Sequence, residues 1–151
     1  MKLSSTPITL WGLSILFSVL VTSCDQDVKP STSSNSESAS ARTTTKIEHI
    51  DVTGAVSLLA STDKPLVIDV RTPDEFGEGH IEGATMVDFK ASDFESKLSE
   101  LDRNQTYLVH CRSGGRSAES LPVFEKLGFK HIINLDGGIT AWQEAGNPVV
   151  K

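Results

Sequence analysis

Residues 66–70 (LVIDV) place the tightest constraint on how this 151-residue chain can fold. Leucine, valine and isoleucine stand side by side there instead of alternating with polar residues, which is typical of a strand buried on both faces. Strands of this kind occur in parallel sheets, because the helices that connect parallel strands cover both sides of the sheet. The run therefore predicts an α/β domain.

The rest of the chain after residue 45 alternates between strand patterns and helix patterns. Strands are predicted at residues 47–50, 66–70, 84–87, 107–109 and 131–135. Helices are predicted at residues 55–60, from residue 72, at 92–101, at 116–127 and at 139–144. This order implies a central, mostly parallel sheet of about five strands, flanked by helices on both sides.

Two of the predicted helices begin with a capping signal. Thr72 is followed three positions later by Glu75, and Ser92 is followed in the same way by Glu95. In such a capping box each side chain satisfies a free backbone N–H of the first turn. Pro122 lies inside the fourth predicted helix and predicts a kink there, because proline lacks the backbone donor.

A single cysteine lies in a positively charged, glycine-containing loop at residues 110–117 (HCRSGGRS). The loop follows a predicted strand and precedes a predicted helix, which is where ligands bind in α/β sheets. Gly114 and Gly115 allow the backbone to curl, so that successive N–H groups converge beside the positive end of the helix dipole. We expect an anion nest that favours the nucleophilic thiolate form of Cys111.

The order and spacing of several motifs resemble those of single-domain rhodaneses, a family of sulfurtransferase modules. The motifs are DVRTP at 69–73 with EF at 75–76, GHIEGA at 79–84, CRSGGRS at 111–117, and GGI at 137–139 with Trp142. The resemblance covers about residues 46–150 and implies a rhodanese-like fold that needs no cofactor. It further implies that Cys111 takes a sulfane sulfur from a small anionic donor such as thiosulfate. The resulting persulfide then passes the sulfur to cyanide or to a thiol.

The resemblance implies roles for the loop residues, and position along the chain suggests roles for Asp69, Arg71 and His110. Cys111 is the expected catalytic residue, and the expected substrate-binding residues are Arg112, Ser113, Gly114, Gly115 and Arg116. Arg116 is expected to brace the loop and Arg112 to attract the donor, with a plain surface charge as the alternative for each. Asp69 and Arg71 are expected to support the site, with an ion pair that holds the following turn as the alternative to catalysis. His110 is expected to pack, with tuning of the adjacent thiol as the alternative.

Two other functions remain open. A His-Cys pair followed by Arg-Ser also begins and ends the phosphate loop of tyrosine phosphatases, so a cysteine phosphatase or arsenate reductase is one alternative. Those loops are one residue longer, whereas four residues separate Cys111 from Arg116 here, and in this superfamily the shorter loop is associated with sulfur transfer. The other alternative is a non-catalytic module that docks a partner, although such modules usually lack the cysteine.

The N-terminus predicts an exported lipoprotein. An apolar run at residues 8–21 follows Lys2 and has the length of a signal-peptide core, short of the roughly 20 residues of a spanning helix. Residues 21–24 (VTSC) resemble the lipobox of bacterial lipoproteins, which predicts removal of residues 1–23 and lipidation of Cys24. The lipid would hold the protein on the periplasmic side of the inner or the outer membrane. A plain signal peptide or a short anchor is the alternative.

The segment that follows predicts a flexible connection to the folded domain. Residues 24–45 begin with the cysteine that is expected to be lipidated and contain mostly Ser, Thr and other polar residues. This composition predicts a disordered tether. A rhodanese-like domain is expected to follow at 46–151. Lipidation of Cys24 would leave Cys111 without a partner, which marks a reactive thiol. A Cys24–Cys111 disulfide is the alternative.

The net charge and the spacing of possible metal ligands limit the classes of partner that we expect for this chain. Twenty acidic residues against 14 basic ones give a net charge of −6, and no basic face is apparent. We therefore expect no nucleic-acid partner. No cluster has metal-ligand spacing, so no metal is expected either. The sequence predicts no particular protein partner.

Overall fold

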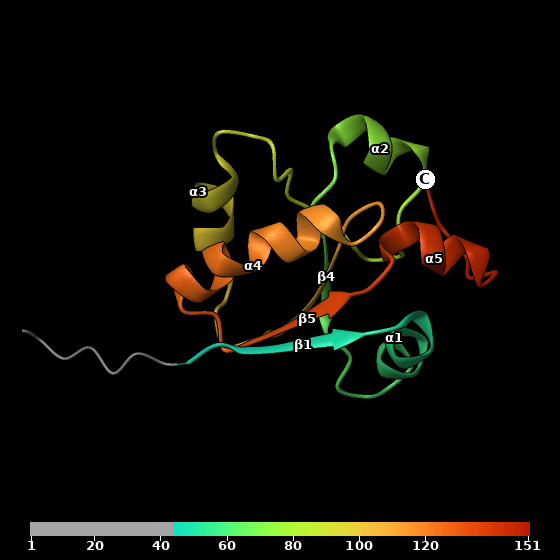
Figure 1. Cartoon of the computed structure of the whole chain (residues 1–151), viewed down its shortest axis with the longest axis horizontal. Helices are drawn as coiled ribbons and strands as arrows, with labels where there is room; N and C mark the ends of the chain where they lie inside the picture. Colours follow the sequence, from blue (N-terminus) through green and yellow to red (C-terminus); the bar gives the residue numbers. More distant parts are fainter. Residues whose placement is uncertain (1–43) are drawn as a thin grey trace, which may run out of the picture. The chain divides into compact units, whose positions relative to one another are not determined.

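A computed structural model describes residues 44–151 as a five-stranded sheet with helices on both sides (Figure 1). The strands are β1 (Lys46–Ile50), β2 (Leu66–Asp69), β3 (Thr85–Met86), β4 (Thr106–His110) and β5 (His131–Leu135). The helices are α1 (Val52–Leu59), α2 (Pro73–Glu78), α3 (Phe94–Ser99), α4 (Gly115–Leu127) and α5 (Gly138–Glu144). The order is β1-β5-β4-β2-β3 and every neighbouring pair is parallel, which confirms the predicted fold class. The predicted signal peptide, Cys24 and almost all of the predicted tether lie outside the described residues.

The two faces of the sheet bury separate apolar clusters, because successive side chains of a strand point to opposite faces. Ile68 and Val109 belong to the cluster under α3 and α4, whereas Val67 and Leu108 belong to the cluster under α1 and α5. Figure 1 shows α3 and α4 on one side of the strands and α1 on the other. Burial of each such side chain stabilises the fold by about 1.5–3 kcal/mol. β2 lies between β3 and β4 and is covered on both faces, which explains the unbroken apolar run in its sequence.

The capping box predicted at Thr72 is present and begins α2. The Thr72 side chain accepts a hydrogen bond from the Glu75 N–H, and Glu75 Oε2 accepts one from the Thr72 N–H at 3.2 Å. Pro73 occupies the first helical position, where its missing donor costs nothing. None of the α2 residues is buried, so the helix depends on these end contacts rather than on a core.

The capping box predicted at Ser92 is wrong. α3 begins after Asp93, which makes no side-chain capping bond. The Glu95 carboxylate, which would have reached back to the Ser92 N–H, is instead bound by Lys126 of α4, with Nζ 2.7 and 2.9 Å from its two oxygens. A tertiary ion pair has therefore replaced the local cap.

Other predicted bounds also differ from the structure. α1 begins three residues earlier than predicted, because the Asp51 side chain accepts a hydrogen bond from the Gly54 N–H at 2.8 Å and caps the helix there. The strand predicted at 84–87 shortens to two residues, since β3 pairs only with the end of β2. Pro122 lies within α4 and does not end it.

The functional features of the sequence gather where the parallel strands end. β2, β4 and β5 all finish at the same edge of the sheet, which places the segments leading into α2, α4 and α5 at that edge. An antiparallel bridge between His80 and Val150 ties the C-terminal segment to the chain just after α2. None of the helices in residues 44–151 has the length and apolar character needed to cross a bilayer.

Candidate active site

The Cys111 loop connects β4 to α4 and wraps around the cysteine sulfur. Gly114 adopts φ 95°, a left-handed conformation that favours glycine, and its N–H donates to Cys111 Sγ at 3.1 Å. Ser117 Oγ lies 3.7 Å from Sγ and 3.0 Å from Gly114 O, so its single proton can be given to either acceptor. The Cys111 sulfur therefore has two hydrogen-bond donors within reach, one from the backbone and one from a side chain.

The start of α5 supports this loop from behind. The Ile139 N–H donates to Cys111 O at 2.9 Å, and the Thr140 N–H donates to Arg112 O at 3.0 Å. Gly138 makes the close approach possible, because a Cβ at this position would lie 2.5 Å from Cys111 O and 2.7 Å from Arg112 O. Both carbonyl groups at the start of the loop are thereby fixed in orientation.

Arg116 and Glu75 form a bidentate ion pair at the other end of the loop. Arg116 Nη1 lies 2.7 Å from Glu75 Oε2, and Nη2 lies 2.6 Å from Oε1. The Arg116 guanidinium lowers the pKa of Glu75 from 4.5 to about 2, with help from Thr72 and against the opposing effect of burial. Among residues 44–151 the guanidinium has no other hydrogen-bond partner, so it braces α2 rather than the loop backbone.

The predicted supporting residues Asp69 and Arg71 form a buried ion pair. Arg71 Nη2 lies 2.6 Å from Asp69 Oδ2 and also donates to Gly79 O at 2.7 Å. The Arg71 side chain is 6% exposed and the Asp69 side chain is 0% exposed, so both charges are almost entirely shielded from solvent. This geometry is that of an ion pair holding the turn through α2, the alternative that the sequence left open.

His110 packs in the core directly before Cys111. Its Nδ1 lies 3.2 Å from Cys111 O, and its Nε2 lies 3.7 Å from Asp69 Oδ2 without a hydrogen-bond partner in the described residues. Burial lowers the pKa of His110, with the Asp69 carboxylate acting in the opposite direction. Burial therefore disfavours a positive charge on this ring.

A polar cavity of about 440 Å³ opens between the Cys111 loop, α2 and α5. Its lining residues are Arg71, Glu75, Glu78, Gly79, Arg112, Ile139, Thr140 and Gln143. Arg112 is exposed at this cavity. Cys111 itself is only 1% exposed, so a reactant must approach its sulfur through the loop.

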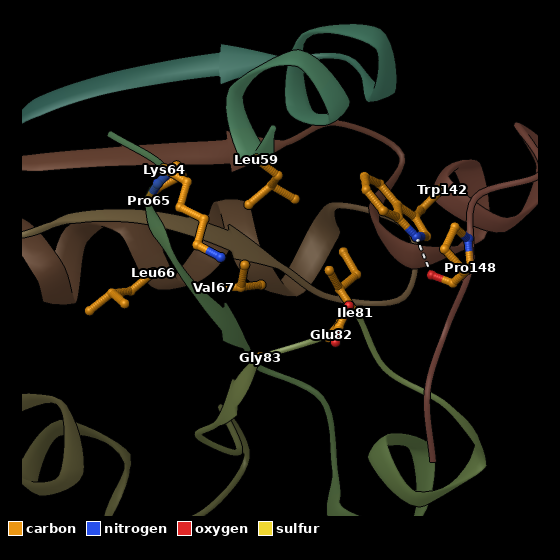
Figure 2. A pocket seen from close by; sticks show the side chains of 10 residues that line it. All are labelled: Leu59, Lys64, Pro65, Leu66, Val67, Ile81, Glu82, Gly83, Trp142 and Pro148. Atoms are coloured by element: carbon orange, nitrogen blue, oxygen red, sulfur yellow. Dashed lines mark hydrogen bonds between the residues drawn. The ribbon is translucent and has the colours of Figure 1, made fainter. Parts of the chain in front are cut away.

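A larger, more apolar cavity of about 590 Å³ lies elsewhere, on the side of β2 that faces α1 and α5. Figure 2 shows Leu59, Val67, Ile81 and Trp142 among the side chains around it. None of the residues that line it belongs to the Cys111 loop. This cavity is therefore separate from the Cys111 loop.

The structure brings the predicted loop residues together and adds three that the sequence did not single out. Arg112, Ser113 and Gly115 are exposed around the buried Cys111, whereas Gly114 and Arg116 are partly buried. The added residues are Glu75, Ser117 and Gly138. All three stood within the motifs that carry the family resemblance, and Glu75 also carried a capping signal. Nothing in the sequence, however, paired Glu75 with an arginine 41 residues away. No group of metal-binding side chains occurs in the part of the chain that the structure describes.

Comparison with known proteins supplies relatives for this site. The family model described as "Rhodanese-like domain" matches residues 52–145. A sulfurtransferase of Allochromatium vinosum is 32% identical over 104 residues, which cover 69% of this chain and 95% of that protein. The putative sulfurtransferase YtwF of Bacillus subtilis is 31% identical, with 68% of this chain and 97% of that protein covered.

Two solved structures are similar over the same region. A rhodanese-related protein from Thermoplasma volcanium has a TM-score of 0.61 and 31% identity, covering 68% of this chain and 97% of that chain. A protein of unknown function from Rhodopseudomonas palustris, described as a possible tyrosine phosphatase, has a TM-score of 0.57 and 25% identity, covering 69% and 85%.

Proposed function

Because this chain belongs to the family of rhodanese-like domains and has sulfurtransferases among its relatives, we propose that it transfers a sulfane sulfur through a persulfide on Cys111. The observation that carries the proposal is the Gly114 N–H directed at Cys111 Sγ, because this donor can stabilise the negative charge that the sulfur carries during transfer. A thiolate is a soft nucleophile, and sulfane sulfur is a soft electrophile. The donor is a small sulfur anion such as thiosulfate, and the acceptor is cyanide or a thiol.

The reaction needs no proton transfer and no outside oxidant. The Cys111 thiolate attacks the outer sulfur of thiosulfate, the sulfur–sulfur bond of the donor breaks, and sulfite leaves with the bonding electrons. Cys111 then carries a persulfide anion, which takes over the position near the Gly114 N–H and the Ser117 hydroxyl. Attack by cyanide or a thiolate on the terminal sulfur breaks the new bond and regenerates the Cys111 thiolate.

Phosphate or arsenate chemistry is the second candidate, because one similar structure is described as a possible tyrosine phosphatase. A phosphoryl oxyanion is best held by a guanidinium that offers two parallel donors. In this chain both Nη groups of Arg116 are bound to Glu75. The loop between Cys111 and Arg116 is also the shorter kind. Both features favour sulfur transfer.

We also propose that a lipid on Cys24 anchors the domain to a bacterial membrane on the periplasmic side. The support is the sequence at residues 21–24 with the apolar run before it. The polar residues up to 45 would then give the domain some freedom to meet its donor and acceptor near the membrane.

Intact mass spectrometry tests the proposed reaction. A full-length chain with Cys24→Ser keeps Cys111 as its single thiol. Thiosulfate should add the mass of one sulfur atom, cyanide should remove it as thiocyanate, and Cys111→Ser should abolish both changes. Hydrolysis of aryl phosphates without a sulfur adduct would put the phosphatase first. Neither adduct nor hydrolysis would instead indicate a binding module.

A further inference from the structure

Arg116 lies in the loop that is proposed to bind an anion, but its charge is already paired with Glu75. The Glu75 carboxylate raises the pKa of Arg116 through a two-pronged hydrogen bond, and burial acts in the opposite direction. Both Nη groups point to Glu75, and the two side chains are only 19% and 23% exposed. Such a shielded, bidentate pair is stronger than an ordinary surface ion pair.

Glu75 is held in place independently of Arg116. Its Oε2 accepts hydrogen bonds from the Thr72 N–H at 3.2 Å and from the Thr72 hydroxyl at 3.1 Å. These bonds belong to the capping box that begins α2, so they hold the carboxylate through contacts within one turn. The Arg116 guanidinium, in contrast, is held by Glu75 alone among the described residues, and its three-carbon stem has the reach to turn toward another anion if that pair is removed.

We propose that Glu75 is a positioning residue that keeps Arg116 away from the anion at Cys111 and thereby prevents the loop from retaining tetrahedral oxyanions. This inference rests on the proposed sulfur transfer. The donor is a dianion and so is the sulfite that leaves. A free guanidinium beside the sulfur would bind both tightly, along with inorganic phosphate and sulfate. With Arg116 occupied, the loop holds an anion through backbone N–H groups and the Ser117 hydroxyl, and sulfite can depart.

The Glu75→Gln variant, compared with a matched control, separates the positioning of Arg116 from the effect of losing one negative charge in α2. Glutamine cannot form the charged bidentate pair, so Arg116 becomes free to turn toward the loop. Asp74→Asn is the matched control, because Asp74 is the preceding residue of α2, is exposed, and loses the same charge. Asp74 also has no hydrogen bond or ion pair to Arg116 in the described residues.

The assay measures how inorganic phosphate protects Cys111 from alkylation by neutral iodoacetamide in the full chain with Cys24→Ser. We expect Glu75→Gln to bind phosphate about tenfold more tightly than the parent protein, as a newly available charge-assisted fork would. Asp74→Asn should leave the affinity unchanged within about twofold. Adding Arg116→Gln to Glu75→Gln should remove the gain, because the gain comes from the guanidinium.

Turnover gives a second readout that a purely structural role would not reproduce. With thiosulfate and cyanide, Glu75→Gln should lower KM for thiosulfate and also lower kcat, because sulfite leaves more slowly. Equal phosphate affinity in Glu75→Gln and Asp74→Asn would overturn the proposal, and so would a gain that survives Arg116→Gln. If Glu75→Gln does not fold, Glu75→Asp, which shortens the reach to Arg116, replaces it under the same criteria. The protection assay needs only a reactive thiol, so it decides this point even if thiosulfate adds no sulfur.

Discussion

The Gly138→Ala variant should distort the Cys111 loop, although residue 138 takes no part in the chemistry. Gly138 has φ +58°, and a Cβ there would lie 2.5 Å from Cys111 O, 2.7 Å from Arg112 O and 2.8 Å from Arg112 C. All three are backbone atoms, which cannot turn aside as the end of a side chain can. Either the loop or the start of α5 must therefore move.

The cost of this substitution has two parts. A non-glycine residue in the left-handed region costs about 1–2 kcal/mol. The forced backbone shift adds about 1–3 kcal/mol, as overpacking does elsewhere, so we expect a total of about 2–5 kcal/mol. Gly146→Ala is the matched control, because Gly146 has φ +78° and a Cβ there would meet nothing within 4 Å. The control should lose only the first part, about 1–2 kcal/mol.

Two measurements on both variants separate the effects. Urea unfolding measures the loss of stability, and the rate of sulfur loading from thiosulfate on the folded protein measures the damage to the loop. We expect Gly138→Ala to be less stable than Gly146→Ala and to load sulfur at least about tenfold more slowly under conditions where both remain folded, since a 1 Å displacement at a reactive group is enough for such a loss. Gly146→Ala should load sulfur like the parent protein. Equal stability of the two variants, with unchanged loading in Gly138→Ala, would refute the view that α5 positions the loop.

Two further predictions concern pH and the membrane. The pKa of Glu75 falls from 4.5 to about 2 on pairing with Arg116, so this carboxylate stabilises the fold fully above pH 4.5 and loses the contribution as the pH falls from about 4.5 to about 2. Solvent screening limits the effect to about 1–2 kcal/mol, and the difference in urea midpoint between the parent protein and Glu75→Gln should shrink over that interval; a constant difference would contradict the pairing. For the anchor, Cys24→Ser should release the protein from bacterial membranes or leave it unprocessed, as seen by fractionation and gel migration. A variant that behaves like the parent protein in both would refute lipidation.

Local signals determined the framework of the site. The unbroken apolar run in β2 requires cover on both faces, so a central place in a parallel sheet follows from side-chain period alone. Thr72 and Glu75 are three residues apart, and their capping box forms as predicted because all of its bonds lie within one turn. The strand pattern before Cys111 and the helix pattern after it place the cysteine at the carboxyl ends of the strands, the edge where α/β sheets bind ligands. Both patterns are local, so this placement also follows from the sequence.

Partners that lie far apart in the chain were decided only by the tertiary structure. Glu95 satisfies the spacing of a capping box, yet Lys126 of a neighbouring helix binds it instead. Glu75 carries a capping signal that says nothing of Arg116, which reaches it only because α2 and α4 start at the same edge of the sheet. Backbone hydrogen bonds within a turn depend on residues that are close together in the sequence, so they can be predicted from the sequence alone. Which charged side chains meet depends on the path of the whole chain, because a charged group pairs with whichever opposite charge the packed elements bring within reach.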